Sequence, residues 1–382
     1  MEFAWSEEDR SFRRELREFL AATLPPGWVE READPSESEH VAFSRQYAKR
    51  LAERGWLTPH WPREYGGQEA TPWRMTVLAE ELWAHGEPRG PQYMNVNWIG
   101  PTIMAHGSDE QKRYHLPRIA GGDVIWCQGF SEPNAGSDLT ALSTKAVRDG
   151  DVYVVNGQKI WTSYANEAEF CFLLVRTGVS GDPREGITIL LTPMGLPGIE
   201  VRDIGAVVGE HAFHEVFFSD VRVPVDCRLG DEGRGWDLVR TALSRERVGS
   251  RRYTRTGATV DRTASWARDH DRFDDSSVQE RLAEAWVACE VARVLSYKVV
   301  DEVARGETRG ASASLARVAA TRADQAAGNL CVDLMGVEGL AAGGSADVQY
   351  RRLALVAGIA AGATEVQLDL IARGGLRLPR QR

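Results

Sequence analysis

The amino-acid sequence predicts an α+β protein in three parts: an N-terminal α-helical domain over residues 1–122, a small central β-barrel or sandwich over 123–230, and a C-terminal four-helix bundle over 231–382. Apolar residues recur at helical spacing in the first and last parts, and the spacing changes to about two from Val124. In the central part, short apolar runs alternate with turn residues, and no helical pattern lies between them. This arrangement is typical of a small barrel or sandwich.

The N-terminal part is predicted to begin with a helix that follows Ser6. Ser6 is a suitable N-cap residue, and acidic residues follow it in the first turn, where the helix dipole favours negative charge. Phe12, Leu16, Phe19 and Leu20 recur on one face of this helix, which ends before Pro25-Pro26-Gly27. The same periodicity predicts further helices over 43–55, 72–84, from Pro101 to His106, and over 110–119.

The central part is predicted to consist of several strands. Val152–Val155 and Lys159–Trp161 are expected to form two strands that a tight hairpin turn at Asn156-Gly157 joins. Further buried strands are expected over 170–175, 187–191 and 214–218. From residue 236 the helical spacing returns in four long patterns joined by short connections, which favours an antiparallel bundle; the patterns span 236–268, 277–304, 312–335 and 346–373.

Composition excludes several classes of function. The formal net charge of −9 argues against nucleic acid as a partner, because phosphate binding requires a basic face. The five cysteines are widely spaced and form no CxxC pair, so reduced buried cysteines are expected, with no zinc site and no disulfide framework. Neither a signal peptide nor a long apolar run is found, so no membrane association is expected and a cytoplasmic protein is predicted.

Two motifs stand out in the central part. The first runs Ser131-Glu132-Pro133-Asn134-Ala135-Gly136-Ser137-Asp138, and the second runs Asn156-Gly157-Gln158-Lys159-Ile160-Trp161. Both resemble the signatures of the acyl-CoA dehydrogenase family, and the order of helical, β and helical parts resembles that family over nearly the whole chain. The sequence around the motifs most resembles the actinobacterial branch of the family, which handles bulky acyl-CoA esters, including steroid side chains.

The resemblance implies that FAD is the cofactor and that the two motifs surround its isoalloxazine ring. The Ser131 hydroxyl and neighbouring backbone groups would hydrogen-bond the pyrimidine edge, and Gly129 and Gly136 would permit close backbone approach. Trp161 would cover one face of the ring, although a tryptophan at a strand end is by itself more often a core residue. The cofactor-binding residues implied are Gln128, Phe130, Ser131, Ser137, Trp161, Thr162, Ser163, Thr364 and Glu365.

The resemblance also raises the question of the catalytic base. Most members of the family carry a glutamate in a loop near the C-terminus, where this chain has Ala361. A minority place the base on the first long helix of the bundle, and Glu246 falls at that position, before Arg247. Burial against the flavin and the acyl chain would raise the pKa of Glu246 and make it a competent base. The alternative is that Glu246 is a solvated ion-pair partner among arginines.

The remaining implied contacts concern substrate and partners. Ser137 and Arg247 would meet the acyl-CoA thioester, and Arg373 would meet the CoA unless it is an ordinary exposed arginine at a helix end. Asp333 replaces a glutamine, and Val337 a glycine, in the element with which family members reach a neighbouring FAD. The chain is therefore expected to be a homotetramer or a heterotetramer with a related chain.

Three functions stay open at this point. The first is an FAD-dependent acyl-CoA dehydrogenase that passes electrons to an electron-transfer flavoprotein. The second is a non-catalytic partner subunit of a heteromeric dehydrogenase, and the third is a flavin oxidase of the same fold.

Overall fold

The computed structural model describes residues 5–28, 38–178, 181–240, 251–307, 311–336, 346–360 and 362–379. The chain divides into two compact units. The sheet unit comprises Asp34–Glu69 and Arg89–Glu246, and the bundle unit comprises Met1–Ala33, Ala70–Pro88 and Arg247–Arg382. Among the described residues, no helix is both long enough and apolar enough to span a membrane.

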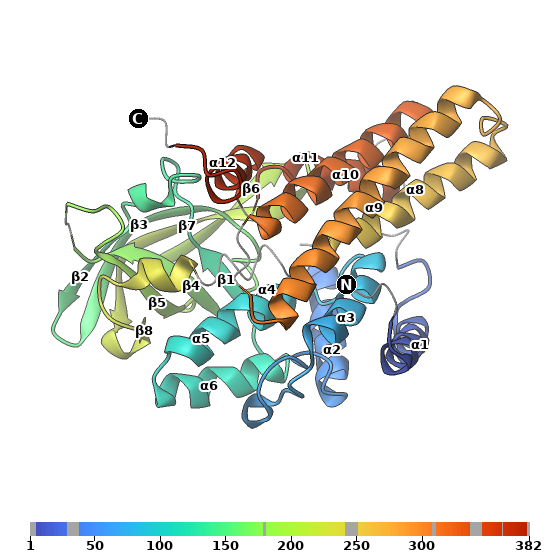
Figure 1. Cartoon of the computed structure of the whole chain (residues 1–382). Coiled ribbons are helices and arrows are strands. Elements are labelled where there is room, and N and C mark those ends of the chain that lie inside the picture. The colour runs from blue at the N-terminus through green and yellow to red at the C-terminus, as the bar shows by residue number, and fades with distance from the viewer. Residues whose placement is uncertain are drawn as a thin grey trace. The chain divides into compact units, whose positions relative to one another are not determined.

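The sheet unit combines short helices with eight strands (Figure 1). Its main helices are α2 (Ser38–Glu53), α5 (Gly100–His106) and α6 (Asp109–Ala120), and α4 (Gln92–Met94) and a π-helical turn (Asn95–Ile99) precede α5. A capping box formed by Ser108 and Gln111 begins α6. The strands are β1 (Trp126–Gly129), β2 (Lys145–Asp149), β3 (Val152–Thr162), β4 (Phe170–Arg176), β5 (Ile187–Pro193), β6 (Ile199–Ala206), β7 (Gly209–Pro224) and β8 (Arg228–Leu229).

All eight strands belong to one hydrogen-bonded sheet in the order β6-β7-β3-β2-β4-β5-β8, and β1 pairs with β4 in parallel. The core of this unit consists of buried side chains that alternate along β3, β4 and β7, including Tyr153, Val155, Cys171, Val216 and Val221. The predicted change from helical to β-structure near residue 124 is confirmed, because β1 begins at Trp126. None of the five cysteines forms a disulfide.

The predicted hairpin at Asn156-Gly157 is wrong, because β3 continues through both residues. Asn156 faces Lys145 on β2 and Gly157 faces Phe218 on β7, so the dipeptide lies inside a strand that is paired on both sides. A register shift between Val155 and Gly157 marks a bulge there. A Cβ at Gly157 would lie 2.7 Å from the Cα of Thr144, the residue before β2. Close packing against this segment therefore explains the glycine.

The bundle unit contains α1 (Glu7–Thr23), α3 (Pro72–Ala84), α8 (Arg252–Asp269), α9 (Ser276–Ala304), α10 (Ser312–Met335), α11 (Ala346–Val356) and α12 (Thr364–Gly374). The Ser6 cap is confirmed, since its hydroxyl accepts the Asp9 N–H at 3.0 Å. In Figure 1, α8, α9 and α10 run side by side as long rods. The helix predicted over 346–373 is two helices, α11 and α12, with Gly362 at a φ of +88° between them.

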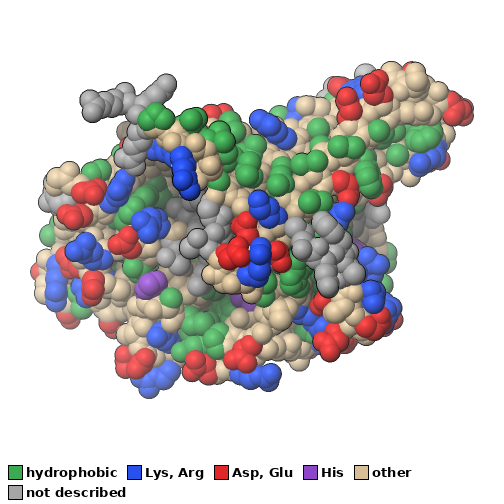
Figure 2. Space-filling view, in the orientation of Figure 1, with side chains coloured by type: hydrophobic (Ala, Val, Ile, Leu, Met, Phe, Trp, Pro, Cys, Tyr) green, Lys and Arg blue, Asp and Glu red, His purple; other side chains and the backbone are tan. Residues whose placement is uncertain are grey.

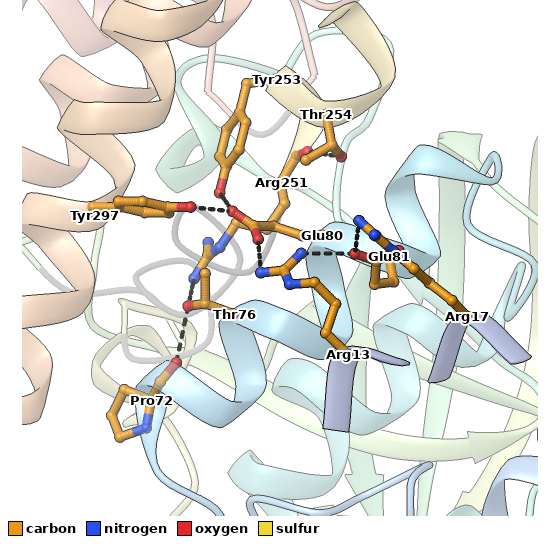
Figure 3. A network of polar contacts seen from close by, with 10 residues as sticks. All are labelled: Arg13, Arg17, Pro72, Thr76, Glu80, Glu81, Arg251, Tyr253, Thr254 and Tyr297. Atoms are coloured by element: carbon orange, nitrogen blue, oxygen red, sulfur yellow. Dashed lines mark hydrogen bonds and ion pairs between the residues drawn. The ribbon is translucent and has the colours of Figure 1, made fainter. Parts of the chain in front are cut away.

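A buried carboxylate on α3 ties four helices of this unit together (Figure 3). Both Tyr253 on α8 and Tyr297 on α9 donate to Oε1 of Glu80, at 2.7 and 2.6 Å. Arg13 on α1 donates to Oε2 of Glu80 at 2.6 Å and also bonds Glu81. Burial and the Glu80 charge raise the pKa of Tyr253 and of Tyr297, so both hydroxyls stay protonated donors.

Removing both tyrosine hydroxyls should cost more stability than the two single changes add up to. Tyr253→Phe or Tyr297→Phe alone leaves one donor on Oε1 and should cost about 1–3 kcal/mol. The double variant leaves that buried oxygen without a hydroxyl donor, so the two losses should not be additive. Calorimetric melting would measure this, with Tyr114→Phe, an exposed tyrosine (47%), as the unaffected control. Additive losses would contradict the prediction.

Candidate functional site

The first motif begins on β1 and continues into the loop after it. The half-buried Gln128 accepts a hydrogen bond at Oε1 from the indole N–H of Trp98 (2.9 Å), so its amide nitrogen is the group left for another acceptor. Phe130 is buried against Phe172, with ring centroids 6.0 Å apart. Ser131 is half-buried and Ser137 is exposed. The motif therefore offers one amide and two hydroxyls to a ligand.

The second motif lies at the end of β3, where the strand is irregular. From Lys159 to Thr162 β3 advances three residues, while β7 passes from Val216 to His214, which is two. Trp161 sits in this bulge at a φ of +60°, a conformation that costs a residue with a Cβ about 1–2 kcal/mol. The bulge leaves its indole ring 54% exposed, with an edge-to-face contact to Phe213. Strained backbone that exposes a large ring is a common feature of ligand sites.

Thr162 follows in the same bulge and is buried. Its hydroxyl has no hydrogen-bond partner among the residues that the structure describes. Leaving a buried hydroxyl unsatisfied costs about 1–3 kcal/mol, so such a group calls for a ligand or an ordered water. Ser163, half-buried, comes next in the chain. Trp161 thus provides an exposed aromatic ring, and the next residue provides a buried hydroxyl without a partner in the described residues.

A buried ion pair joins the two motifs. Lys159, which is fully buried, donates to Oε1 of Glu132 at 2.7 Å and to the Phe130 carbonyl at 3.2 Å. Glu132 also accepts the backbone N–H groups of Ser143 (2.6 Å) and Thr144 (2.8 Å). A backbone hydrogen bond from Ile160 to Ser131 adds a further link of 2.9 Å. The charged residues of both signatures therefore hold the motifs together.

The ionisation of this pair follows from its surroundings. Burial by itself would raise the pKa of Glu132, but the charge of Lys159 and the hydrogen bonds that the carboxylate accepts lower that pKa to about 2. Burial lowers the pKa of Lys159, and Glu132 opposes this shift. With all these donors on the carboxylate, the ionised pair is the state we expect at neutral pH.

The two glycines of the first motif differ in what they pack against. A Cβ at Gly129 would lie 2.8 Å from both the Cys171 Sγ and the Leu173 Cδ1 of β4, so close packing between strands explains this glycine. At Gly136 a Cβ would meet nothing within 4 Å. Close approach of backbone to a ligand thus stays an expectation for Gly136, whereas Gly129 is required by the sheet.

Three further predicted site residues belong to the bundle unit. Thr364 begins α12, and its hydroxyl donates to the Gly358 carbonyl at 3.3 Å. Glu365 is exposed in the first turn. Arg373 forms an exposed ion pair with Asp369 at 2.8 Å, one helical turn away. Glu246, Arg247 and Ala361 lie outside the described residues.

The acid that interrupts the family element on α10 has a partner. Asp333 lies 2.6 Å from Arg281 of α9 in an ion pair exposed on both sides. Its charge is thus balanced within the bundle unit. Among the described residues, no group of three or more His, Cys, Asp or Glu side chains could hold a metal ion.

Sequence reasoning missed three contributors to the site: the Glu132–Lys159 pair, Trp98 and His214. His214 is fully buried, and its Nδ1 contacts the Thr162 carbonyl at 3.0 Å. The pair could have been suspected, since the first motif carries acidic residues and the second carries a lysine. For Trp98 and His214 no local signal exists, because their partners are 30 and 52 residues away.

Comparison with known proteins places the chain in a family. Three family models match successive segments: the N-terminal domain of acyl-CoA dehydrogenase over residues 6–123, the middle domain over 127–221 and the C-terminal domain over 233–376. The acyl-CoA dehydrogenase FadE26 of Mycobacterium tuberculosis is 34% identical, with 100% of this chain and 99% of that protein covered. IpdE1 from the same organism, also an acyl-CoA dehydrogenase, is 32% identical over 97% and 98% of the two chains.

Solved structures agree with these matches. The Tcur3481–Tcur3483 steroid ACAD superimposes with a TM-score of 0.93 and 32% identity, and 100% of both chains is covered. The ChsE4–ChsE5 complex from Mycobacterium tuberculosis gives 0.89 and 34%, again over 100% of both chains. The predicted fold class and enzyme class are confirmed: the chain belongs to the acyl-CoA dehydrogenase family of flavoprotein oxidoreductases.

Proposed function

We propose that this chain binds FAD at the two motifs of the sheet unit and oxidises an acyl-CoA thioester to its α,β-unsaturated product. The observation that carries the proposal is the bulge of β3, which leaves the Trp161 ring exposed and the buried Thr162 hydroxyl without a partner in the described part of the chain. A flat heterocycle with a polar edge satisfies both groups at once. The proposed cofactor-binding residues are Gln128, Phe130, Ser131, Ser137, Trp161, Thr162, Ser163, Thr364 and Glu365.

In this proposal, different residues bind the cofactor, remove the α-proton and orient the thioester. When bound, FAD supplies an acceptor for the hydride that leaves the substrate's β-carbon. The Thr162 and Ser131 hydroxyls and the Gln128 amide hydrogen-bond the polar edge of the cofactor, and the Trp161 ring keeps water from one face. In this proposal the Glu246 carboxylate removes the α-proton, and Ser137 and Arg247 orient the thioester.

For Arg373 the support is weaker. Its ion pair with Asp369 is what an exposed arginine at a helix end makes, and a contact with CoA requires this pair to open. Thr364 likewise already uses its hydroxyl proton on Gly358, which leaves its oxygen lone pairs for a ligand.

A bulky acyl group is the proposed substrate class. Support comes from a structural relative that covers this chain completely, the Tcur3481–Tcur3483 steroid ACAD. Branched or steroid-sized side chains on the thioester are therefore the first substrates to test. An electron-transfer flavoprotein is the proposed acceptor of the electrons.

Assembly with a second chain, as a homotetramer or a heterotetramer, is also part of the proposal. Helix α9 exposes Trp286, Val287, Val291 and Val294, whose exposed fractions range from 37% to 56%. These residues recur at helical spacing, and Figure 2 shows green hydrophobic side chains along the course of this helix. An apolar stripe on the exposed face of a helix is typical of a protein interface. The two structural relatives, Tcur3481–Tcur3483 and ChsE4–ChsE5, are each named for two chains.

Purification of the chain alone tests the proposal. We expect a yellow protein whose flavin band bleaches on addition of a bulky acyl-CoA ester and not of a short one. Rapid reoxidation by O₂, faster than by an artificial electron acceptor, would instead indicate an oxidase. A protein that stays colourless after reconstitution with FAD would contradict cofactor binding and favour the role of a non-catalytic partner subunit.

A further inference from the structure

His214 lies where three strands meet at the end of β3. It pairs with Thr162 of β3 on one side and with Asp203 of β6 on the other. Its ring is fully buried, with Nδ1 3.0 Å from the Thr162 carbonyl and Nε2 3.2 Å from Oδ1 of Asp203. A carbonyl oxygen only accepts hydrogen bonds, so Nδ1 carries a proton and donates it to Thr162.

This hydrogen bond falls at the point where β3 departs from regular pairing. The extra residue between Lys159 and Thr162 interrupts the backbone ladder with β7. A bulge alone leaves the strand free to adopt more than one arrangement, and Trp161 at positive φ adds strain. The imidazole of His214 supplies a donor to the backbone there, and the Asp203 carboxylate lies beside Nε2 at 3.2 Å without a hydrogen bond to it.

Thr162 thus has its carbonyl fixed by His214, while its hydroxyl has no partner in the described residues. A histidine that only filled the core could stand at any buried position along β7. His214 instead contacts Thr162, the residue that carries the unused hydroxyl and follows Trp161. The contact therefore controls the direction of both groups that a planar ligand would meet.

We propose that His214 is a positioning residue for the flavin: its imidazole holds the Thr162 carbonyl, so that the bulge presents the Trp161 ring and the Thr162 hydroxyl in one fixed arrangement. The inference rests on the proposed function, since the ligand is the FAD ring.

Three variants separate positioning from general stability. His214→Leu removes the donor and keeps a side chain of comparable bulk. His214→Asn keeps an amide N–H near the place of Nδ1, and Asp203→Asn keeps the imidazole and removes the carboxylate. Each apoprotein is titrated with FAD well below its melting temperature, and the visible circular dichroism of the bound flavin is recorded at saturation.

His214→Leu should weaken FAD binding about tenfold or more and change the visible circular dichroism, because that signal depends on how the site holds the ring. His214→Asn should bind within about threefold of the natural protein with its spectrum restored, and Asp203→Asn, which keeps the Nδ1 donor, should do the same. Should the leucine variant fail to fold, His214→Gln, whose amide reaches towards Asp203 and not towards Thr162, is expected to show the same loss.

Two results would overturn the inference. One is unchanged FAD affinity and spectrum in His214→Leu, or in His214→Gln where leucine does not fold. The other is an equal loss in the leucine and asparagine variants, which would mean that the donor is not the cause. A natural apoprotein that binds no FAD would overturn the proposed function itself, and this inference with it, on the evidence of the unmutated chain alone.

Discussion

Replacing Glu246 by glutamine is expected to lower the turnover of acyl-CoA dehydrogenation by about 10²–10⁴-fold, the range that a positioned general base contributes. The amide has nearly the shape of the carboxylate but cannot take the α-proton. Bound flavin should stay in place, because the proposed cofactor contacts come from other residues. Stopped-flow measurement of flavin bleaching by a saturating acyl-CoA ester gives the rate directly, separate from reoxidation.

The matched control is Glu64→Gln, the same chemical change at an exposed glutamate, which should leave the rate unchanged. A second comparison uses Ala361, the position at which most family members carry the base. Adding Ala361→Glu to Glu246→Gln should restore part of the lost rate if the two positions serve the same α-carbon. Turnover of Glu246→Gln within a fewfold of the natural chain would show that another residue is the base.

Much of the fold could be predicted because local patterns determined it. The helix predicted over 72–84 is α3 with the same bounds, since Thr71 caps it and Pro72 begins it. The buried face of α1 was predicted residue by residue for the same reason. The family and its two motifs were likewise recognisable from consecutive residues.

The errors share a cause, which is that partners distant in sequence overrode local preference. Asn156-Gly157 favours a hairpin turn, but pairing with β2 and β7 on both sides keeps it within a strand. The helical pattern likewise continues through the break between α11 and α12, where Arg317 of α10 donates to the Ala357 and Ala360 carbonyls. The bulge that exposes Trp161 depends on its register against β7, and no pattern of neighbouring residues specifies it.

The Glu132–Lys159 pair is the second position where a single change should have a large effect. Lys159→Met leaves a buried carboxylate without its cation, and Glu132→Gln leaves a buried ammonium without its anion. Breaking a buried pair from one side typically costs about 3–5 kcal/mol, whereas replacing both partners costs much less. Each single variant should therefore melt well below the natural chain, and the double variant Glu132→Gln/Lys159→Met should recover a large part of the loss. Equal melting temperatures for the singles and the natural chain would contradict an ionised buried pair.

The same pair makes a prediction about pH. The folded-state pKa of Glu132 is lowered to about 2 from an ordinary value of 4.5, so the unfolded chain takes up the proton first as the pH falls. The stability that the pair contributes is accordingly complete above about pH 4.5 and is lost as the pH falls towards 2. In the double variant this part of the acid dependence should disappear.

Because Lys159 also holds the Phe130 carbonyl, loss of the pair should unfold the two motifs and release FAD. Flavin fluorescence and melting should therefore change over the same pH range. Flavin release at a higher pH than unfolding would show that the pair holds the motifs together less tightly than its contacts indicate.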